Sequence, residues 1–182
     1  MPNLRVCGSP ITLSPEMSYL GMTIDKSMLF KTQFRNASAK AERITTKLAR
    51  ILPNVGGPRE DRRHLSSVMH SVLLYGTPSW ACTLDLIPAN VSQLNRPQRK
   101  VLIRSICGYR TISEAASNVI RSTPPADLLP REREAQFEKR RFGRHGQEGI
   151  EPKKRTLSAW QERWDSGSSG QWTRRLIPNV TQ

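Results

Sequence analysis

Acidic residues are scarce in this 182-residue chain. Asp and Glu number 15 against 29 Lys and Arg, which gives a formal net charge of +14. A positive surplus of this size favours a polyanionic partner. Nucleic acid is the commonest such partner, and an acidic membrane surface is the alternative.

Long apolar runs and cysteine clusters are also missing. No apolar run approaches the roughly 20 residues that span a bilayer, and the N-terminus has no signal-peptide apolar region, so we expect no membrane partner. The three cysteines, Cys7, Cys82 and Cys107, lie far apart in the sequence. They cannot supply the CxxC spacing of a zinc site, and their odd number suits a reducing compartment.

No residue pattern typical of a catalytic centre is present. Two-metal phosphoryl transfer needs carboxylates that converge on the ions. The one adjacent acidic pair, Glu60 and Asp61, lies between arginines at an expected helix start, where the helix dipole and ion pairs explain it. The chain contains neither a GxxxxGK(S/T) phosphate loop nor an HExxH zinc motif. We therefore expect no catalytic residue, metal ligand or cofactor in this chain.

Hydrophobic periodicity predicts a mainly α-helical fold after an N-terminal β-hairpin, the remnant of a larger sheet. Residues 1–25 are expected to form strands, of which residues 17–24 are the longest candidate. Helices are expected over residues 29–51, 58–75, 89–106 and 114–120, separated by Gly and Pro breaks. From residue 130 the sequence is highly charged and lacks the apolar density of a separate core, which predicts a loose basic C-terminal tail.

The first predicted helix has an apolar side and a basic side. Its apolar residues follow a four–three spacing from Phe30 to Ile51. Only Glu42 offsets the basic residues on the opposite arc and its flank. Such a face fits a row of phosphates, and it also fits an ordinary solvated helix. The nucleic-acid-binding candidates on this helix are Arg35, Lys40, Arg43, Lys47 and Arg50.

The third predicted helix repeats this basic pattern with Arg96, Arg99 and Lys100 as further nucleic-acid-binding candidates. Pro97 lies within it and predicts a kink or a later start. Two basic runs follow in the tail, KRR at residues 139–141 and KKR at residues 153–155. Each run fits a nuclear-entry signal, a nucleic-acid contact or plain solvated charge.

Short motifs follow one another along the chain in a distinctive order. They are MSYLGMTID at residues 17–25, LLYGTPSW at 73–80, NRPQRKVL at 95–102, YRTISEAA at 109–116 and PPADLL at 124–129. WQERW at residues 160–164 and GQWTRRLIP at 170–178 complete the series. This order resembles the C-terminal part of the Pol polyprotein of non-LTR (LINE-like) retrotransposons, in the style of the insect elements that insert into ribosomal DNA and of Jockey-like elements.

The resemblance implies an organisation and a set of partners. Residues 1–25 would end a reverse transcriptase palm, residues 26–126 would form a helical thumb-like domain, and residues 127–182 would be a basic, partly disordered downstream segment. Tyr19, Leu20 and Gly21 would belong to the primer grip, and the helices would hold the template–primer duplex of RNA and DNA. The parent polyprotein would be an RNA-directed DNA polymerase with an endonuclease. It would use Mg²⁺ and act in the nucleus after cytoplasmic assembly of a ribonucleoprotein.

The chain departs from that family in ways that predict a fragment. The paired aspartates of the catalytic centre, the endonuclease and a cysteine–histidine knuckle are missing, so the chain would need the palm and fingers of its parent as partners. Changes within the motifs suggest a decayed copy. Two alternatives stay open: a stand-alone basic helical protein that binds nucleic acid, and an inert helical interaction bundle.

Overall fold

The computed structural model describes residues 5–7, 9–10, 14–51, 61–142 and 151–181. The described part is mainly helical, which confirms the predicted fold class. The strands are β1 (Arg5–Val6), β2 (Ser9–Pro10), β3 (Glu16–Tyr19) and β4 (Met22–Asp25). The helices are α1 (Lys31–Ile51), α2 (Asp61–Leu73), α3 (Thr77–Trp80), the 3₁₀ helix η1 (Ala81–Leu86), α4 (Pro88–Ser105), α5 (Glu114–Ile120), α6 (Leu129–Phe142), α7 (Pro152–Ser166) and α8 (Gln171–Leu176).

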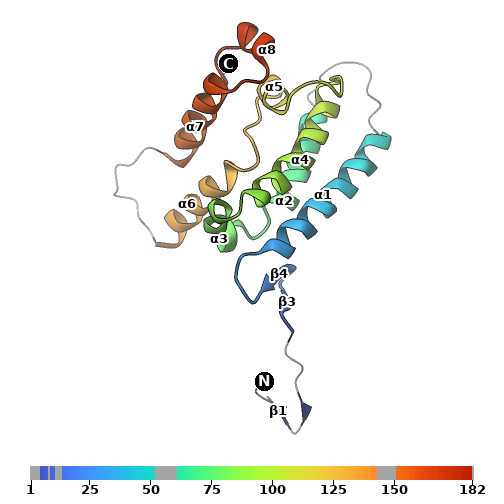
Figure 1. Ribbon diagram of the computed structural model, residues 1–182, viewed down its shortest axis with the longest axis vertical. Helices are drawn as coiled ribbons and strands as arrows, with labels where there is room; N and C mark the ends of the chain where they lie inside the picture. The colour runs from blue at the N-terminus through green and yellow to red at the C-terminus, as the bar shows by residue number, and fades with distance from the viewer. Residues whose placement is uncertain (1–4, 8, 11–13, 52–60, 143–150, 182) are drawn as a thin grey trace.

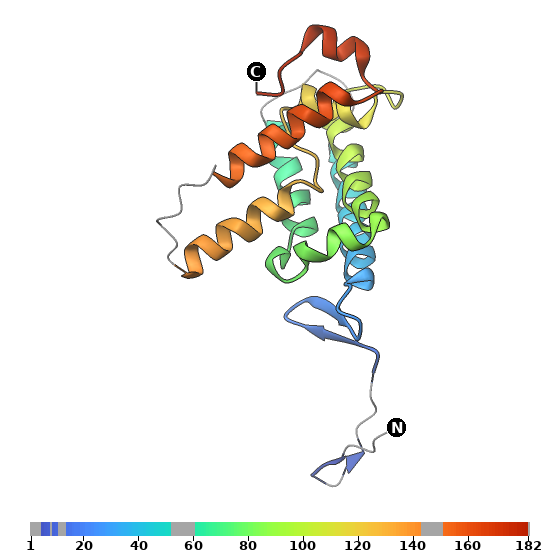
Figure 2. The ribbon, with the colours of Figure 1, turned by 60° about the vertical axis from the view of Figure 1, so that its left-hand side comes forward.

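Helices α1, α2 and α4 lie lengthwise beside one another and form the body of the molecule (Figure 1). Helices α6 and α7 lie on the side of the body away from α1, and the two small antiparallel hairpins, β1–β2 and β3–β4, extend from one end (Figures 1 and 2). The predicted helix over residues 114–120 is confirmed with the bounds of α5, and the Ser113 Oγ caps it by accepting a hydrogen bond from the Ala116 N–H at 3.2 Å.

The main core is built on the apolar side of α1. Phe30 and Phe34 are each 2% exposed, and Ala41 is fully buried. The Phe34 ring meets the buried Trp80 ring edge-to-face, with 4.8 Å between the ring centroids, a favourable arrangement for aromatic pairs. The predicted apolar side of this helix is therefore the side that α2 and α4 cover.

The strand predicted over residues 17–24 is wrong as a single strand. The chain reverses at Leu20 and Gly21, which both have left-handed backbone angles, with φ of 47° and 80°. Tyr19 and Met22 therefore face each other across a two-residue hairpin turn. Left-handed conformation at two successive residues closes a tight turn, and Gly21 adopts it without strain.

The β3–β4 hairpin is attached to the body through the segment after α2. The Tyr75 hydroxyl donates a hydrogen bond to the Leu20 carbonyl at 2.7 Å, and the Trp80 Nε1–H donates to the Tyr75 carbonyl at 2.9 Å. Gly76 has a φ of 68°, and a Cβ there would lie 1.8 Å from the Met22 sulfur. Glycine adopts this backbone conformation without strain and leaves room for the Met22 side chain, and two of the recognised motifs are in direct contact.

Two polar side chains of α4, Asn95 and Gln98, connect this helix to later segments. Asn95 donates to the Asp127 carboxylate at 2.9 Å. Gln98, which is fully buried, donates to the Pro124 carbonyl at 2.7 Å and accepts from the Ala126 N–H at 2.8 Å. Because no water reaches this amide, each of these hydrogen bonds satisfies a group that would otherwise be stranded.

The region after residue 130 differs from the expected loose tail. Its described residues form α6, α7 and α8, and Trp160 and Trp164 are 3% and 1% exposed. These rings pack with Ala116, Val119 and Val180 into a second apolar cluster. Two tryptophans bury as much area as several aliphatic residues, so a count of apolar residues underestimated this core.

Asp127 holds α7 to the body. Arg163 of α7 donates to both of its carboxylate oxygens, at 3.0 and 2.8 Å, and the carboxylate is largely buried. The same carboxylate accepts the hydrogen bond from Asn95 of α4. The bidentate hydrogen bond to Asp127 raises the pKa of Arg163. One acidic residue thus joins helices that are about 70 residues apart in sequence.

We expect His70 to make the fold sensitive to mild acid. Its Nε2 lies 3.0 Å from the Gln98 amide nitrogen, and that nitrogen carries only protons, so Nε2 must accept and the ring must be neutral. Burial, with a smaller contribution from Arg133, lowers the pKa of His70 to about 4. The stabilisation is therefore fully present above the unfolded pKa near 6.5 and is lost as the pH falls toward 4.

The expected loss of unfolding free energy between pH 7 and pH 5 is about 2 kcal/mol from this group. Urea unfolding at pH 7 and at pH 5 measures this loss of unfolding free energy. In the variant His70→Gln, which has no titrating ring, the part of the loss that comes from His70 should disappear. The same pH dependence in the variant and the parent chain would contradict a neutral, buried His70.

Candidate nucleic-acid interface

The predicted basic face of α1 is solvent-exposed. All five of its cationic side chains are exposed, and they extend from the hairpin end of the helix to its last turn. Four of them line one shallow hollow along the helix together with Glu42 and Thr46; these four are Lys40, Arg43, Lys47 and Arg50. Arg35 lies nearer the hairpin, where its guanidinium donates to the Thr32 hydroxyl at 3.4 Å.

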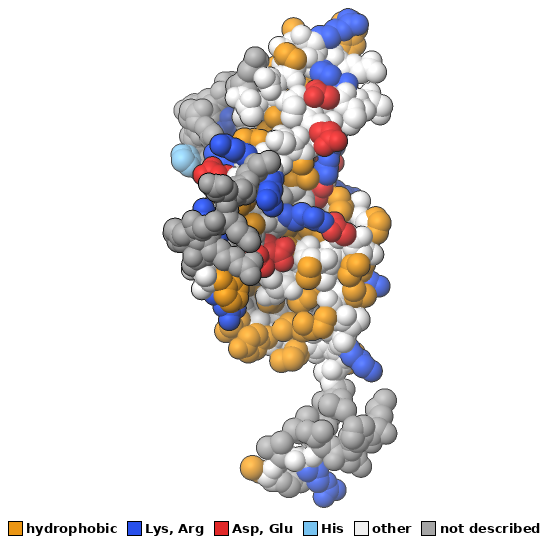
Figure 3. All heavy atoms as spheres, turned by 90° about the vertical axis from the view of Figure 1, so that its left-hand side faces the viewer, with side chains coloured by type: hydrophobic (Ala, Val, Ile, Leu, Met, Phe, Trp, Pro, Cys, Tyr) orange, Lys and Arg blue, Asp and Glu red, His pale blue; other side chains and the backbone are white. Residues whose placement is uncertain are grey.

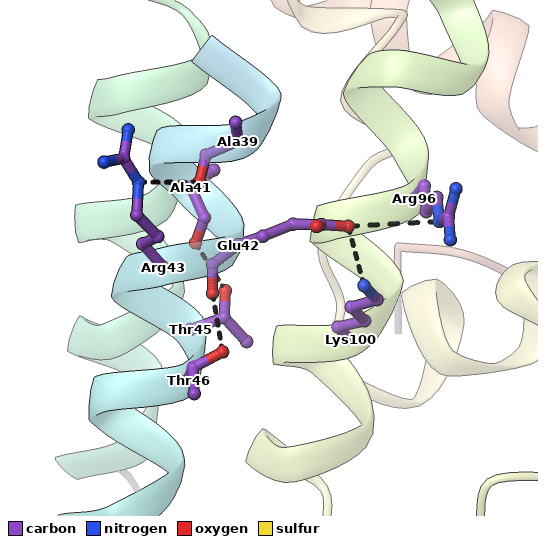
Figure 4. A network of polar contacts seen from close by, with 8 residues as sticks. All are labelled: Ala39, Ala41, Glu42, Arg43, Thr45, Thr46, Arg96 and Lys100. Carbon is purple, nitrogen blue, oxygen red and sulfur yellow. Dashed lines mark hydrogen bonds and ion pairs between the residues drawn. The ribbon is translucent and has the colours of Figure 1, made fainter. Parts of the chain in front are cut away.

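Glu42 links this face to α4. Its Oε1 accepts a hydrogen bond from the Lys100 ammonium at 2.6 Å and lies 3.9 Å from the Arg96 Nε (Figure 4). One carboxylate thus stands between two cations of α4, while Arg43 points away from it to the other side of α1 (Figure 4). The pair is solvent-exposed and contributes little stability, but it reduces the negative charge that Glu42 presents to an approaching phosphate.

A second hollow continues the first between α1 and α4. Its cationic lining includes Arg104, which belongs to the basic pattern of the third predicted helix, and Arg110, which we did not predict as a binding residue. Thr46 lines both hollows, so they adjoin at that residue. Arg110 was missed because it belongs to the loop before α5, and helix periodicity carries no information about which loop residues reach a groove.

Arg99 differs from its neighbours on α4. Its side chain is half-buried, and one guanidinium nitrogen donates at 2.8 Å both to the Arg110 carbonyl and to the Ile112 carbonyl. It also lines the α1–α4 hollow. Arg99 therefore positions the loop that carries Arg110, and its contact with nucleic acid stays a prediction.

The predicted primer-grip residues lie at the other end of the same face. Tyr19 and Leu20 are 55% and 73% exposed at the hairpin turn. Gly21 lines a groove of about 470 Å³ between the hairpin, α1 and α2, which also includes Asn36 and Lys40. Because Lys40 lines both this groove and the hollow along α1, the hairpin turn and the basic face adjoin.

The described residues contain no group of three His, Cys, Asp or Glu side chains able to hold a metal ion. No helix within the described ranges is long and apolar enough to cross a membrane. The lining of the hollows contains cations, hydroxyls and amides together with the carboxylate of Glu42, and the cations and hydroxyls are groups that bind phosphates.

No protein-family model matches the chain, and no solved structure matches it. Two curated proteins do. The chain is 29% identical over 199 residues, 99% of its own length, to a 115 kDa protein of the type-1 retrotransposable element R1DM of Drosophila melanogaster. It is 28% identical over 200 residues, 98% of its length, to a retrovirus-related Pol polyprotein of the type-1 retrotransposable element R1 of Bradysia coprophila.

The chain spans about a fifth of the length of these relatives, 19% and 20%. The alignments cover all the motifs on which the resemblance was based. The chain is therefore similar over nearly its whole length to proteins of R1 retrotransposable elements, in agreement with the retrotransposon resemblance of its motifs.

Proposed function

We propose that this chain is the part of a retrotransposon reverse transcriptase that holds the template–primer duplex. The observation that carries the proposal is that three hollows adjoin one another. Lys40 lines both the groove at the hairpin turn and the hollow along α1, and Thr46 lines both the hollow along α1 and the groove between α1 and α4. Its cationic residues come from α1, α4 and the loop before α5, and one acidic residue, Glu42, is among its lining residues.

The spacing of the cations supports a nucleic-acid backbone as the ligand. Lys40 and Arg50 are ten residues apart on α1, which places them about 15 Å apart along the helix axis. That length corresponds to the rise of about four base pairs. Long, exposed side chains along it allow several phosphates of one strand to be neutralised without reading of the bases.

The hairpin supports a second partner, namely the palm and fingers of the parent polyprotein. Both β3 and β4 have an unpaired edge in the described structure, and two-stranded sheets are marginal alone. Large apolar side chains are exposed at the same end of the molecule: Met17, Tyr19, Leu20, Met28 and Leu86. Figure 3 shows an apolar patch on the lower part of the body, toward the N-terminal segment.

On this proposal the polymerase chemistry, its Mg²⁺ and the endonuclease belong to other parts of the parent protein. The described residues do not fit a two-metal centre, because their acidic residues do not converge. This chain would position the duplex and the primer end. Nuclear action after cytoplasmic assembly of a ribonucleoprotein is part of the same proposal.

Neutralising the α1 face should weaken duplex binding and its salt dependence. For the triple variant Arg43→Gln, Lys47→Gln and Arg50→Gln we expect roughly tenfold to hundredfold weaker binding of an RNA–DNA primer–template duplex. The slope of log K against log salt should fall by about 2 to 3, since each lost phosphate contact accounts for roughly 0.9. Fluorescence anisotropy between 50 and 200 mM salt measures both.

The matched control neutralises three exposed cations that line none of the three hollows, Lys26→Gln, Arg131→Gln and Arg175→Gln. This variant should keep most of its duplex affinity. An equal loss in both variants would show binding by net charge alone and would overturn the proposed interface. Absence of salt-dependent binding in the parent chain would favour the inert helical bundle.

A further inference from the structure

The two basic runs of the C-terminal region lie at the end of α6 and at the start of α7, two helices that pack against each other. Residues 139–141 occupy the last turn of α6, and residues 153–155 occupy the first turn of α7. Ala135 of α6 and Pro152 of α7 line one cavity of about 520 Å³ between the two helices. Both runs are fully exposed and lie on the side of the molecule away from α1 (Figures 1 and 2).

Exposed aromatic rings accompany these charges. The chain has four phenylalanines, of which Phe30 and Phe34 are 2% exposed in the core. The other two, Phe137 and Phe142, are 43% and 63% exposed near the end of α6. The Arg141 guanidinium carbon lies 6.0 Å from the first of these rings and 5.4 Å from the second. Both rings therefore lie next to the basic run, within the range of a cation–π contact with Arg141, and neither belongs to an apolar cluster of the described residues.

The local charge is positive even with the nearby acids included. Glu138 directly precedes the α6 run and Glu151 precedes α7, against six Lys and Arg in the two runs. Figure 3 looks onto this side of the molecule, where blue side chains cross the middle of the face. A surface that presents cations and accessible aromatic faces together is what unpaired nucleotides bind, because phosphates meet the charges and bases stack on the rings.

We propose that the last turn of α6 and the first turn of α7 together form a binding site for single-stranded nucleic acid. A duplex does not fit these rings, because its bases are already stacked and paired. An acidic protein segment would use the cations but would leave the rings without flat partners. The site shares no residue with the α1–α4 interface and lies on the opposite side of the molecule, so it stands independently of the proposed duplex-holding function.

The first test is photo-crosslinking of the full 182-residue chain to a 12-nucleotide oligouridine that carries 4-thiouridine, and to a 4-thiothymidine oligodeoxynucleotide. Crosslinked peptides should contain residues 136–142 and 151–155. Crosslinks confined to other parts of the chain would overturn the proposal. The two oligonucleotides show whether RNA or DNA is the better ligand, since both supply phosphates and unpaired bases.

The second test separates base stacking from charge. The double variant Phe137→Leu and Phe142→Leu should bind the oligouridine at least tenfold more weakly, with an unchanged salt slope, because stacking contributes without counterion release. The triple variant Lys139→Gln, Arg140→Gln and Lys153→Gln should lower the slope instead. The matched control is Tyr109→Leu, which changes an 83% exposed ring elsewhere and should keep full affinity.

An equal loss in the phenylalanine double variant and the Tyr109 control would overturn the site. So would unchanged affinity in the phenylalanine variant. Circular dichroism confirms that each variant is folded, and crosslinking of the unmodified chain decides the question for any variant that is not. The α1 triple variant, which tests the duplex interface, should keep its crosslinks to residues 136–142.

Discussion

Replacing Gln98 by leucine is expected to lower the free energy of unfolding by about 4 kcal/mol, because leucine fills the space but satisfies none of three polar partners. The Gln98 amide is fully buried, and its loss strands the Ala126 N–H, the Pro124 carbonyl and the His70 ring nitrogen. Each stranded buried group costs about 1–3 kcal/mol. The segment after α5 would also lose its main attachment to α4.

Urea unfolding monitored by circular dichroism measures this effect. Gln136→Leu is the matched control, since Gln136 is exposed on α6 and bonds only to Glu132 in its own helix. That control should stay within about 0.5 kcal/mol of the parent chain. Similar stabilities for the two variants would show that the Gln98 network does not hold the α4 connection together.

Replacing Trp164 by alanine is expected to cost about 3–5 kcal/mol, the usual range for removal of a buried tryptophan. Trp164 is 1% exposed, and its Nε1–H donates to the Ile177 carbonyl at 3.0 Å. The Arg174 guanidinium lies 5.1 Å from its ring. The substitution therefore removes the one side chain of α7 that contacts both Arg174 of α8 and Ile177 after it.

The matched control uses the same substitution at an exposed site. Trp172 is 78% exposed on α8, and its ring contacts only the Arg175 guanidinium among the interactions described, at 4.8 Å. Trp172→Ala should change the unfolding free energy by less than about 1 kcal/mol. Limited proteolysis adds a local readout, because cleavage within α7 and α8 should accelerate in Trp164→Ala alone. Equal resistance of both variants would contradict a structured C-terminal region.

Hydrophobic periodicity predicted α1, α2, α4 and α5 because it reports burial directly. The seam that begins with Phe30 and Phe34 is the buried side of α1, and the Ser113 cap sets the start of α5. The hairpin was harder, because a strand with a glycine and a tight turn share the same pattern until the backbone of Leu20 is known. The C-terminal core was missed because it depends on two large rings, Trp160 and Trp164.

The candidate interface was only partly predictable. Helix geometry identified the α1 cations, because five of them share one side of a 21-residue helix. It did not reveal that Arg99 is used to position a loop, or that Arg110 joins the groove, since both facts depend on a long-range contact. The motifs themselves were informative for a structural reason: Gln98, Asp127 and Arg163 connect one motif to the next.

The shared carboxylate of Asp127 has a consequence for the order in which the chain assembles. The partners of α7 on the body of the molecule, including Asp127 and the helix α5, precede Trp160 in the sequence, whereas Ile177 and Val180 follow it. Because the chain is synthesised from its N-terminus, the body side of this contact leaves the ribosome before the two tryptophans do. Helix α7 therefore docks onto a surface that is already present, and a premature stop after residue 130 would leave that surface uncovered.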